Sequence, residues 1–162
     1  MSGVSTDTYR VERSTTINAD PQPIYDRLVA FHAWMDWSPW EDLDPDQERT
    51  FTGAASGVGA GYAWSGNRKA GRGSMQVTHA AAPTEVRIAL TFEKPFKTRN
   101  TIDFSLTPDG PNRTRVRWAM TGPKTLATKV MGLFTSMDKM IGPDFEKGLA
   151  RLKDLVETRT PS

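Results

Sequence analysis

Three side chains in this sequence could carry acid–base chemistry: His79, Tyr62 and Asp36. His79 shares the parity of Met75 and Val77, so an extended strand would turn all three to one face. A histidine that faces a cavity could act as a general acid or base, because its pKa lies near neutrality. Tyr62 could supply a hydrogen bond to a ligand. The alternative for His79 is a bonded side chain at the end of a strand.

Carboxylates flank a cluster of tryptophans early in the chain. Asp36 and Glu41 lie on either side of Trp37 and Trp40, where a carboxylate could polarise a ligand hydroxyl at the mouth of a cavity. The alternative is a solvated acidic loop, since loops are commonly built this way. The segment 36–48 holds six acids and no base, so it could also be a contact surface for a partner protein.

Aromatic and apolar side chains that share one face of the expected elements could line a pocket, with a few polar groups to orient a ligand. The pattern leaves open a second possibility, that the same side chains fill a packed core. The candidate ligand-binding residues are Trp34, Trp37, Trp40, Tyr62, Trp64, Asn67, Met75, Val77, Leu90, Phe92, Phe104, Trp118, Met120, Met137 and Ile141.

The composition excludes several kinds of chemistry. The 162 residues include no cysteine and two histidines, so disulfides, thiolate metal sites and cysteine nucleophiles are excluded. We therefore expect no metal and no cofactor. The glycines at 57, 59 and 61 lack the spacing of a dinucleotide-binding loop, and no phosphate-binding loop is present.

Charge and hydropathy narrow the possible partners. The net charge is +2 and the basic residues are scattered, which argues against nucleic-acid binding. No apolar stretch approaches the ~18 residues of a membrane span, and the N-terminus lacks the apolar core of a signal peptide. We expect a single cytoplasmic domain spanning 1–162, with an ordered core at about 8–157, that does not insert into membranes and is a monomer or homodimer.

The elements that must position these side chains follow from periodicity. A β-branched run at 9–18 predicts a strand, and Asp20 followed by Pro21 predicts the start of a helix. Period-two alternation then predicts six further strands, at 49–53, 60–64, 73–79, 85–93, 99–107 and 114–121. The last forty residues have helical spacing, with a break or kink expected at Gly142-Pro143. The order predicts an α+β fold: an antiparallel sheet whose dry face is covered by the C-terminal helix.

Several runs of the sequence resemble those of a known group of proteins. They are Trp37-Ser38-Pro39-Trp40, Leu43-Asp44-Pro45, Gly57 to Asn67, Phe92-Glu93-Lys94-Pro95-Phe96, and Met137 to Leu149. Over about residues 8–157 the chain resembles the polyketide cyclase/dehydrase-like branch of the SRPBCC (START-like, helix-grip) superfamily. The resemblance implies a seven-stranded curved antiparallel sheet wrapped around a long C-terminal helix, with two short helices between strands 1 and 2. It also implies a deep apolar cavity.

Three functional hypotheses follow. The first is binding of a small hydrophobic or aromatic ligand, a lipid or polyketide-like metabolite, between the sheet and the C-terminal helix. The second is a polyketide cyclase or dehydratase that uses His79, Tyr62 or Asp36 on a ligand in the same cavity. The third is a regulatory domain that binds a partner through its acidic segment.

Overall fold

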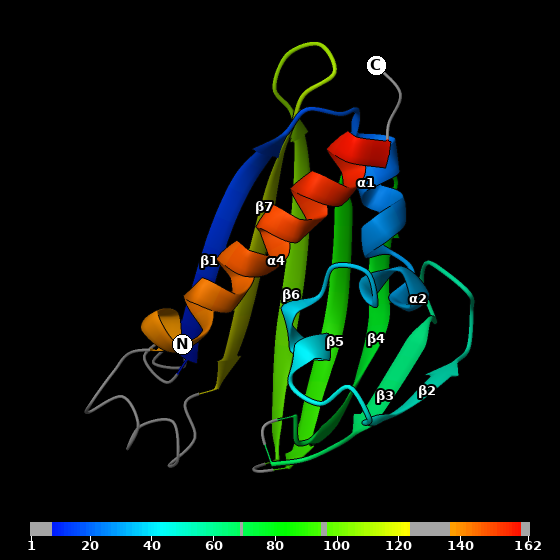
Figure 1. Ribbon diagram of the computed structural model, residues 1–162, viewed down its shortest axis with the longest axis vertical. Helices are drawn as coiled ribbons and strands as arrows, with labels where there is room; N and C mark the ends of the chain where they lie inside the picture. Colours follow the sequence, from blue (N-terminus) through cyan, green and yellow to red (C-terminus); the bar gives the residue numbers. More distant parts are fainter. Residues whose placement is uncertain (1–7, 69, 95–96, 124–136, 160–162) are drawn as a thin grey trace, which may run out of the picture.

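The computed structural model describes residues 8–68, 70–94, 97–123 and 137–159, and its main element is one seven-stranded antiparallel sheet (Figure 1). The strand order is β1-β7-β6-β5-β4-β3-β2, so β2 to β7 form a meander and β1 closes it by pairing with β7. This confirms the expected fold class. The strands are β1 (Thr8–Ile17), β2 (Glu48–Thr52), β3 (Gly61–Ser65), β4 (Arg72–Ala81), β5 (Glu85–Lys94), β6 (Thr98–Pro108) and β7 (Thr114–Pro123).

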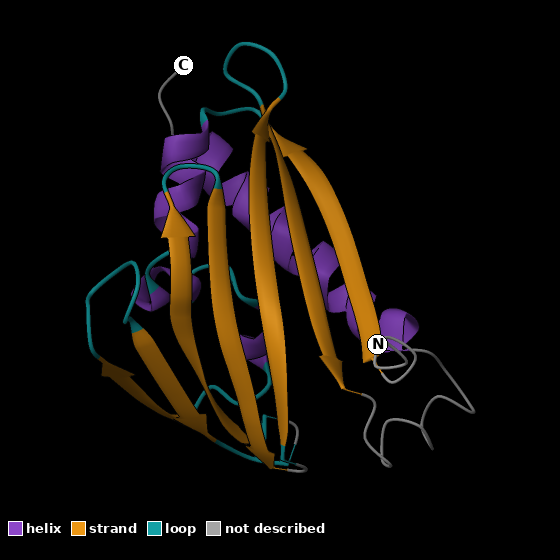
Figure 2. Ribbon diagram, turned by 180° about the vertical axis from the view of Figure 1, so that it is seen from behind, coloured by secondary structure: helices purple, strands orange, loops and turns teal. Residues whose placement is uncertain are grey.

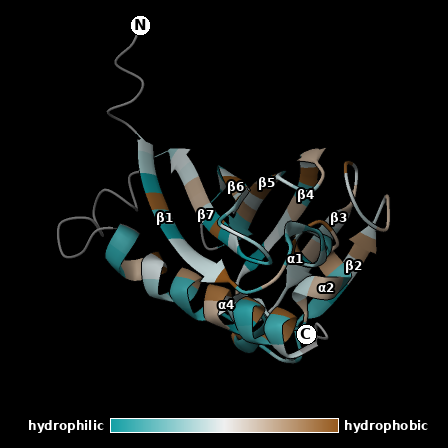
Figure 3. Ribbon diagram, turned by 90° about the horizontal axis from the view of Figure 1, so that it is seen from above, coloured by the Kyte–Doolittle hydropathy of each residue, from teal (hydrophilic) through white to brown (hydrophobic). Residues whose placement is uncertain are grey.

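The described helices all lie on one face of the sheet, and Figure 2 shows the other face uncovered by any of them. The long helix α4 (Met137–Arg159) crosses the sheet beside β1. Three short elements join β1 to β2: α1 (Pro21–Leu28), α2 (Phe31–Trp34) and a 3-10 turn, η2 (Pro39–Asp42). Seen from above, the strands form an arc with the helices inside it (Figure 3). Within the described part of the chain, no helix is both long and apolar enough to cross a bilayer.

Alternation of apolar and polar residues explains why the sheet has one dry face. On β5, Ile88 and Leu90 are buried, whereas Arg87, which precedes Ile88 and has the opposite parity, is exposed. On β7, Trp118 is fully buried and Arg117 beside it is exposed. Burying the inward set is favourable by ~25 cal/mol per Å² of apolar surface, which fixes which face the helices cover.

The expected break at Gly142-Pro143 is wrong, because α4 runs through Pro143 without interruption. Proline removes only one backbone donor here, and contacts to β1 hold the helix on both sides of it. The guanidinium of Arg13 donates to the Asp138 carboxylate at 2.7 and 2.8 Å and to Glu146 at 2.8 Å. A helical pattern was also expected at 126–134, which lies outside the described residues.

Candidate functional site

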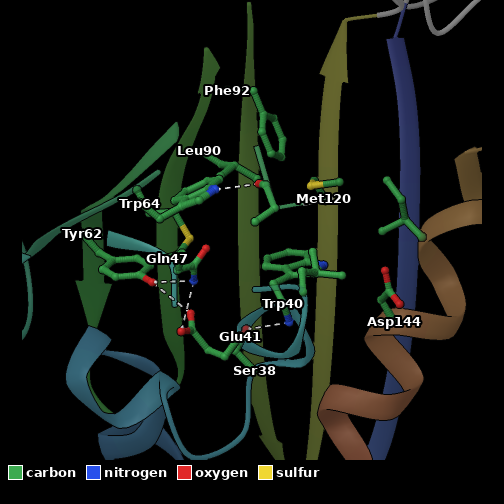
Figure 4. Close-up of a pocket in the computed structure, with 14 residues that line it drawn as sticks. Ser38, Trp40, Glu41, Gln47, Tyr62, Trp64, Leu90, Phe92, Met120 and Asp144 are labelled. Atoms are coloured by element: carbon green, nitrogen blue, oxygen red, sulfur yellow. Dashed lines mark hydrogen bonds between the residues drawn. The ribbon is translucent and has the colours of Figure 1, made fainter. Parts of the chain in front are cut away.

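A cavity of about 220 Å³ lies between the inner face of the sheet, η2 and α4 (Figure 4). An apolar cavity of about 150 Å³ is large enough to bind benzene, so this one has room for a larger ring system. Its walls come from four strands (β3, β4, β5 and β7), from η2 and α4, and from loops that are distant in sequence. The lining residues are Ser38, Trp40, Glu41, Leu43, Gln47, Tyr62, Trp64, Ala70, Met75, Leu90, Phe92, Met120, Ile141 and Asp144.

One wall of the cavity is aromatic and apolar. The Trp64 indole donates to the Ala70 carbonyl at 2.8 Å, so its only polar atom is occupied and its ring presents an apolar surface. Phe92 packs edge-on against this ring, with the ring centroids 5.8 Å apart. Gly73 permits this placement, because a Cβ there would lie 2.7 Å from the indole. Met75 and Leu90 complete the wall.

Beside this wall the cavity carries a polar cluster around the carboxylate of Glu41, whose partner Tyr62 stacks on Trp64 with ring centroids 6.1 Å apart. Arg49 donates from Nε to Oε1 at 2.7 Å, and the Tyr62 hydroxyl donates to Oε2 at 3.0 Å. Burial raises the pKa of Tyr62, and the negative charge of Glu41 raises it further. The hydroxyl therefore stays protonated as a donor. The hydrogen bond to this carboxylate in turn raises the pKa of Arg49, so the guanidinium stays charged.

Gln47 adds a buried amide to this cluster. Its Nε2 lies 3.4 Å from Glu41 Oε1 and 3.5 Å from the Tyr62 hydroxyl, and the residue is only 7% exposed. Its Oε1 is buried and has no hydrogen-bond partner among the described residues. Figure 4 shows this oxygen on the side of the amide away from Glu41. A residue of the cavity wall thus carries an acceptor that the described part of the chain does not satisfy.

Asp144 brings a second carboxylate to the cavity, from α4 on the side away from Glu41 (Figure 4). It makes no ion pair or hydrogen bond with a described side chain and is partly exposed. Among the described residues, no group of three His, Cys, Asp or Glu side chains gathers where it could hold a metal ion.

The structure divides the predicted ligand-binding residues into separate groups. The wall of the cavity includes Trp40, Tyr62, Trp64, Met75, Leu90, Phe92, Met120 and Ile141. The packed core takes Trp34, Trp37, Val77, Phe104 and Trp118, whose exposure is 0–1%. Asn67 is exposed in a loop, where its backbone donates to Asp44 and its amide to the Leu43 carbonyl. The side chain of Met137 lies outside the described residues.

The aromatic core explains why several tryptophans do not reach the cavity. Trp118 stacks on Phe145 of α4 with centroids 4.1 Å apart and planes 5° from parallel. Trp34 and Trp37 pack edge-on against it, and their indoles donate to backbone carbonyls of α1. Trp40 lies at the boundary, in contact with Trp118 and also in the cavity wall. Trp34 and Trp37 are thus part of the packed core.

The structure separates the three predicted catalytic residues. A β-bulge between Val77 and His79 shifts the register of β4, so His79 is exposed and pairs with Arg87 instead of facing the cavity. The predicted facing of His79 is therefore wrong. Asp36 is also away from the cavity: it is half-exposed and forms an ion pair with Arg27 at 3.1 Å. Of the three, Tyr62 alone lines the cavity.

The prediction from sequence missed the residues that give the cavity its polar character. Glu41 was noted beside the tryptophans, but Gln47 lies in a loop without periodicity and gave no signal. Asp144 follows Ile141 by three residues, which is the helical spacing that could have identified it. Ser38, Leu43 and Ala70 were missed for the same reason as Gln47.

Acids of the 36–48 segment are largely engaged within the chain. Asp42 accepts from Arg151 at 2.6 Å and lies 3.2 Å from the Lys147 ammonium, and these cations lower the pKa of its carboxyl group. Asp44 accepts backbone hydrogens from Asp46 and Asn67. These contacts join the segment to α4 and to the loop after β3, so it serves to close the cavity.

The fold and cavity together define a START-like, helix-grip protein. The chain belongs to the family described as polyketide cyclase / dehydrase and lipid transport, whose model matches residues 8–157. This confirms the resemblance to the SRPBCC superfamily noted from the sequence. No curated protein matches the chain.

Solved structures share this fold at low sequence identity. Norcoclaurine synthase from Thalictrum flavum, in complex with dopamine and hydroxybenzaldehyde, is 10% identical, with a TM-score of 0.69 over 96% of this chain and 90% of that one. Protein CV1439 from Chromobacterium violaceum is 14% identical, with a TM-score of 0.65 over 97% and 99%. The Aha1 dimer from Colwellia psychrerythraea is 21% identical, with a TM-score of 0.58 over 94% and 99%. At these identities the likeness concerns the fold alone.

Proposed function

We propose that this protein binds a small, largely aromatic or apolar ligand, of the lipid or polyketide-like class, in the cavity between the sheet and α4. The observation that carries the proposal is the 220 Å³ space lined by an aromatic wall and an adjoining polar cluster. Ligand sites commonly combine apolar walls with a few convergent polar groups. The family description, which includes lipid transport, supports the same function.

The expected affinity follows from the surface that a ligand would bury. An aromatic ring system buries about 150–250 Å², which at ~25 cal/mol per Å² contributes about 4–6 kcal/mol. Loss of ligand freedom opposes this gain. A simple aromatic compound should therefore bind with a dissociation constant no tighter than about 30 μM, and specific hydrogen bonds would be needed for tighter binding.

A cavity-filling variant tests the proposal. Met120 lines the cavity, so Met120→Trp adds apolar volume to the wall and should weaken binding of a hydrophobic fluorescent probe at least tenfold. Met140→Trp is the matched control, because Met140 is exposed on α4. Native mass spectrometry of protein purified from its own host would identify a retained ligand. Absence of binding across a hydrophobic library, or equal binding by Met120→Trp, would refute the proposal.

A second candidate function is acid–base catalysis on a carbonyl compound held in the same cavity. The observation that favours it is the Tyr62 hydroxyl beside the Glu41 carboxylate in the cavity wall. Tyr62 would donate a proton or hydrogen bond to a carbonyl oxygen, and Glu41 would accept a proton. Loss of turnover of a ketide in both Tyr62→Phe and Glu41→Gln would support catalysis. Unchanged turnover in either variant would remove that residue from the reaction.

A further inference from the structure

The unsatisfied amide oxygen of Gln47 indicates which chemical group the ligand carries. We infer that the ligand is an aromatic compound with a free hydroxyl group, and that this hydroxyl donates its hydrogen to Gln47 Oε1. The inference rests on the proposed ligand-binding function and makes it specific. It starts from a side chain that is 7% exposed and has an acceptor atom without a partner among the described residues.

The orientation of the amide is fixed by its neighbours. Gln47 Nε2 faces two oxygens, Glu41 Oε1 at 3.4 Å and the Tyr62 hydroxyl at 3.5 Å. Turning the amide over would place its carbonyl oxygen against the carboxylate, where two acceptors repel each other. The nitrogen must therefore face Glu41, and the oxygen must face the remaining side, where Figure 4 shows it.

The donors of the polar cluster and of the neighbouring indole have other acceptors. The Tyr62 hydroxyl donates to Glu41, Arg49 Nε donates to Glu41, and the Trp64 indole donates to the Ala70 carbonyl. A buried acceptor left without a donor costs free energy, so a ligand that supplies the donor gains relative to one that does not. An ether or ketone at the same place would leave Gln47 unsatisfied.

Charge balance selects a hydroxyl over an ammonium group at this end of the cavity. The carboxylate of Glu41 is neutralised by Arg49 at 2.7 Å, so the cluster around Gln47 has no net negative charge to offer a cation. A cationic group at this end would lose its hydration without a compensating ion pair. A neutral phenol-type hydroxyl loses less on entering the cavity and still provides the required hydrogen.

Three probes of similar shape test the inference on the unmodified protein: naphthalene, 2-methoxynaphthalene and 2-naphthol. Titration calorimetry or ligand-observed NMR would give their dissociation constants. Burial of apolar surface alone favours the methyl ether, because it is the larger and less polar compound. A hydrogen bond to Gln47 reverses that order, and we expect 2-naphthol to bind about tenfold more tightly than the ether.

A pair of variants assigns the preference to Gln47. Gln47→Met keeps the length of the side chain and removes the acceptor, so the preference for 2-naphthol should fall to within about twofold. Gln76→Met makes the same substitution on the exposed outer side of β4 and should keep the full preference. Thermal melts would show whether both variants are folded; if Gln47→Met is not, the probe series on the unmodified protein decides.

The outcomes separate this inference from the function on which it rests. Equal binding of 2-naphthol and its methyl ether, or a preference that persists in folded Gln47→Met, would overturn the hydroxyl assignment and leave ligand binding standing. Failure of all three probes to bind would overturn both. Tighter binding of 2-naphthol that depends on Gln47 would establish that a hydroxyl group of the ligand donates to Gln47.

Discussion

Replacing Arg49 with methionine should lower the free energy of unfolding by about 2 kcal/mol. The substitution keeps most of the apolar stem and removes the guanidinium, which donates to Glu41 at 2.7 Å. A hydrogen bond to a charged group contributes about 1.5–3 kcal/mol. The side chains of Arg49 and Glu41 are 25% and 13% exposed, so solvent reduces the effect towards the lower part of that range. Two longer bonds from Arg49 to backbone carbonyls, both at 3.3 Å, add little.

A matched surface pair provides the control. Arg10 and Glu12 are joined at 2.8 Å, nearly the same distance, but their side chains are 50% and 40% exposed. Arg10→Met should therefore change stability by no more than about 0.5 kcal/mol. Urea denaturation followed by circular dichroism measures both variants, and adding Glu41→Gln to Arg49→Met should recover part of the loss. Equal costs for Arg49→Met and Arg10→Met would refute the view that the polar cluster is shielded from solvent.

Three further predictions concern the core and the termini of the sheet. Phe145→Ala should lower the free energy of unfolding by about 3–5 kcal/mol, because the ring is fully buried against Trp118. Met140→Ala, on the exposed side of α4, should lower it by less than about 0.5 kcal/mol, and urea unfolding compares the two variants. Gly148→Ala should lower the melting temperature despite its better helix propensity, because the new Cβ would lie 2.9 Å from Trp118; a rise would mean that α4 can shift away. Burial raises the pKa of Tyr9 to about 12 in the folded protein, above its unfolded value of about 10. The folded state therefore favours the protonated phenol, and the free energy of unfolding should fall as the pH rises from about 10 to 12. Tyr9→Phe should show a smaller fall in alkaline melts, and an unchanged fall would contradict the assignment.

The architecture could be predicted from the sequence because its signals are local. Alternation runs through the buried parts of β5 and β6 and on β7 fails only at Ala119, and these strands pair in chain order, so parity identifies most of the buried side chains. The same rule failed at His79, since a bulge inserts one residue and reverses the facing of everything after it. Nothing in the residue types around Val77 signals that bulge. The contacts that flank Pro143 in α4 come from Arg13 of β1, more than a hundred residues away in sequence.

The candidate site was harder to predict because burial and cavity lining have the same pattern. Trp118 and Met120 have the same parity on β7, yet Trp118 is covered by Phe145 and Met120 reaches the open space. The difference depends on where α4 and η2 lie over the sheet, which no strand pattern contains. The polar cluster depends on Gln47, in a loop that only the folded chain brings to Tyr62.

The pairing of β1 with β7 also determines the order in which the chain can be assembled. During synthesis, the hairpins from β2 to β7 can form soon after each strand leaves the ribosome, because their contacts are short in sequence. The strand β1 emerges first, but its register with β7 joins Ile17 to Thr114 and Thr8 to Pro123, about a hundred residues later. Its unpaired edge must persist until β7 has emerged, and in that time it is open to association with other chains. Docking of α4 on β1 then completes the fold only after residues 137–159 have emerged.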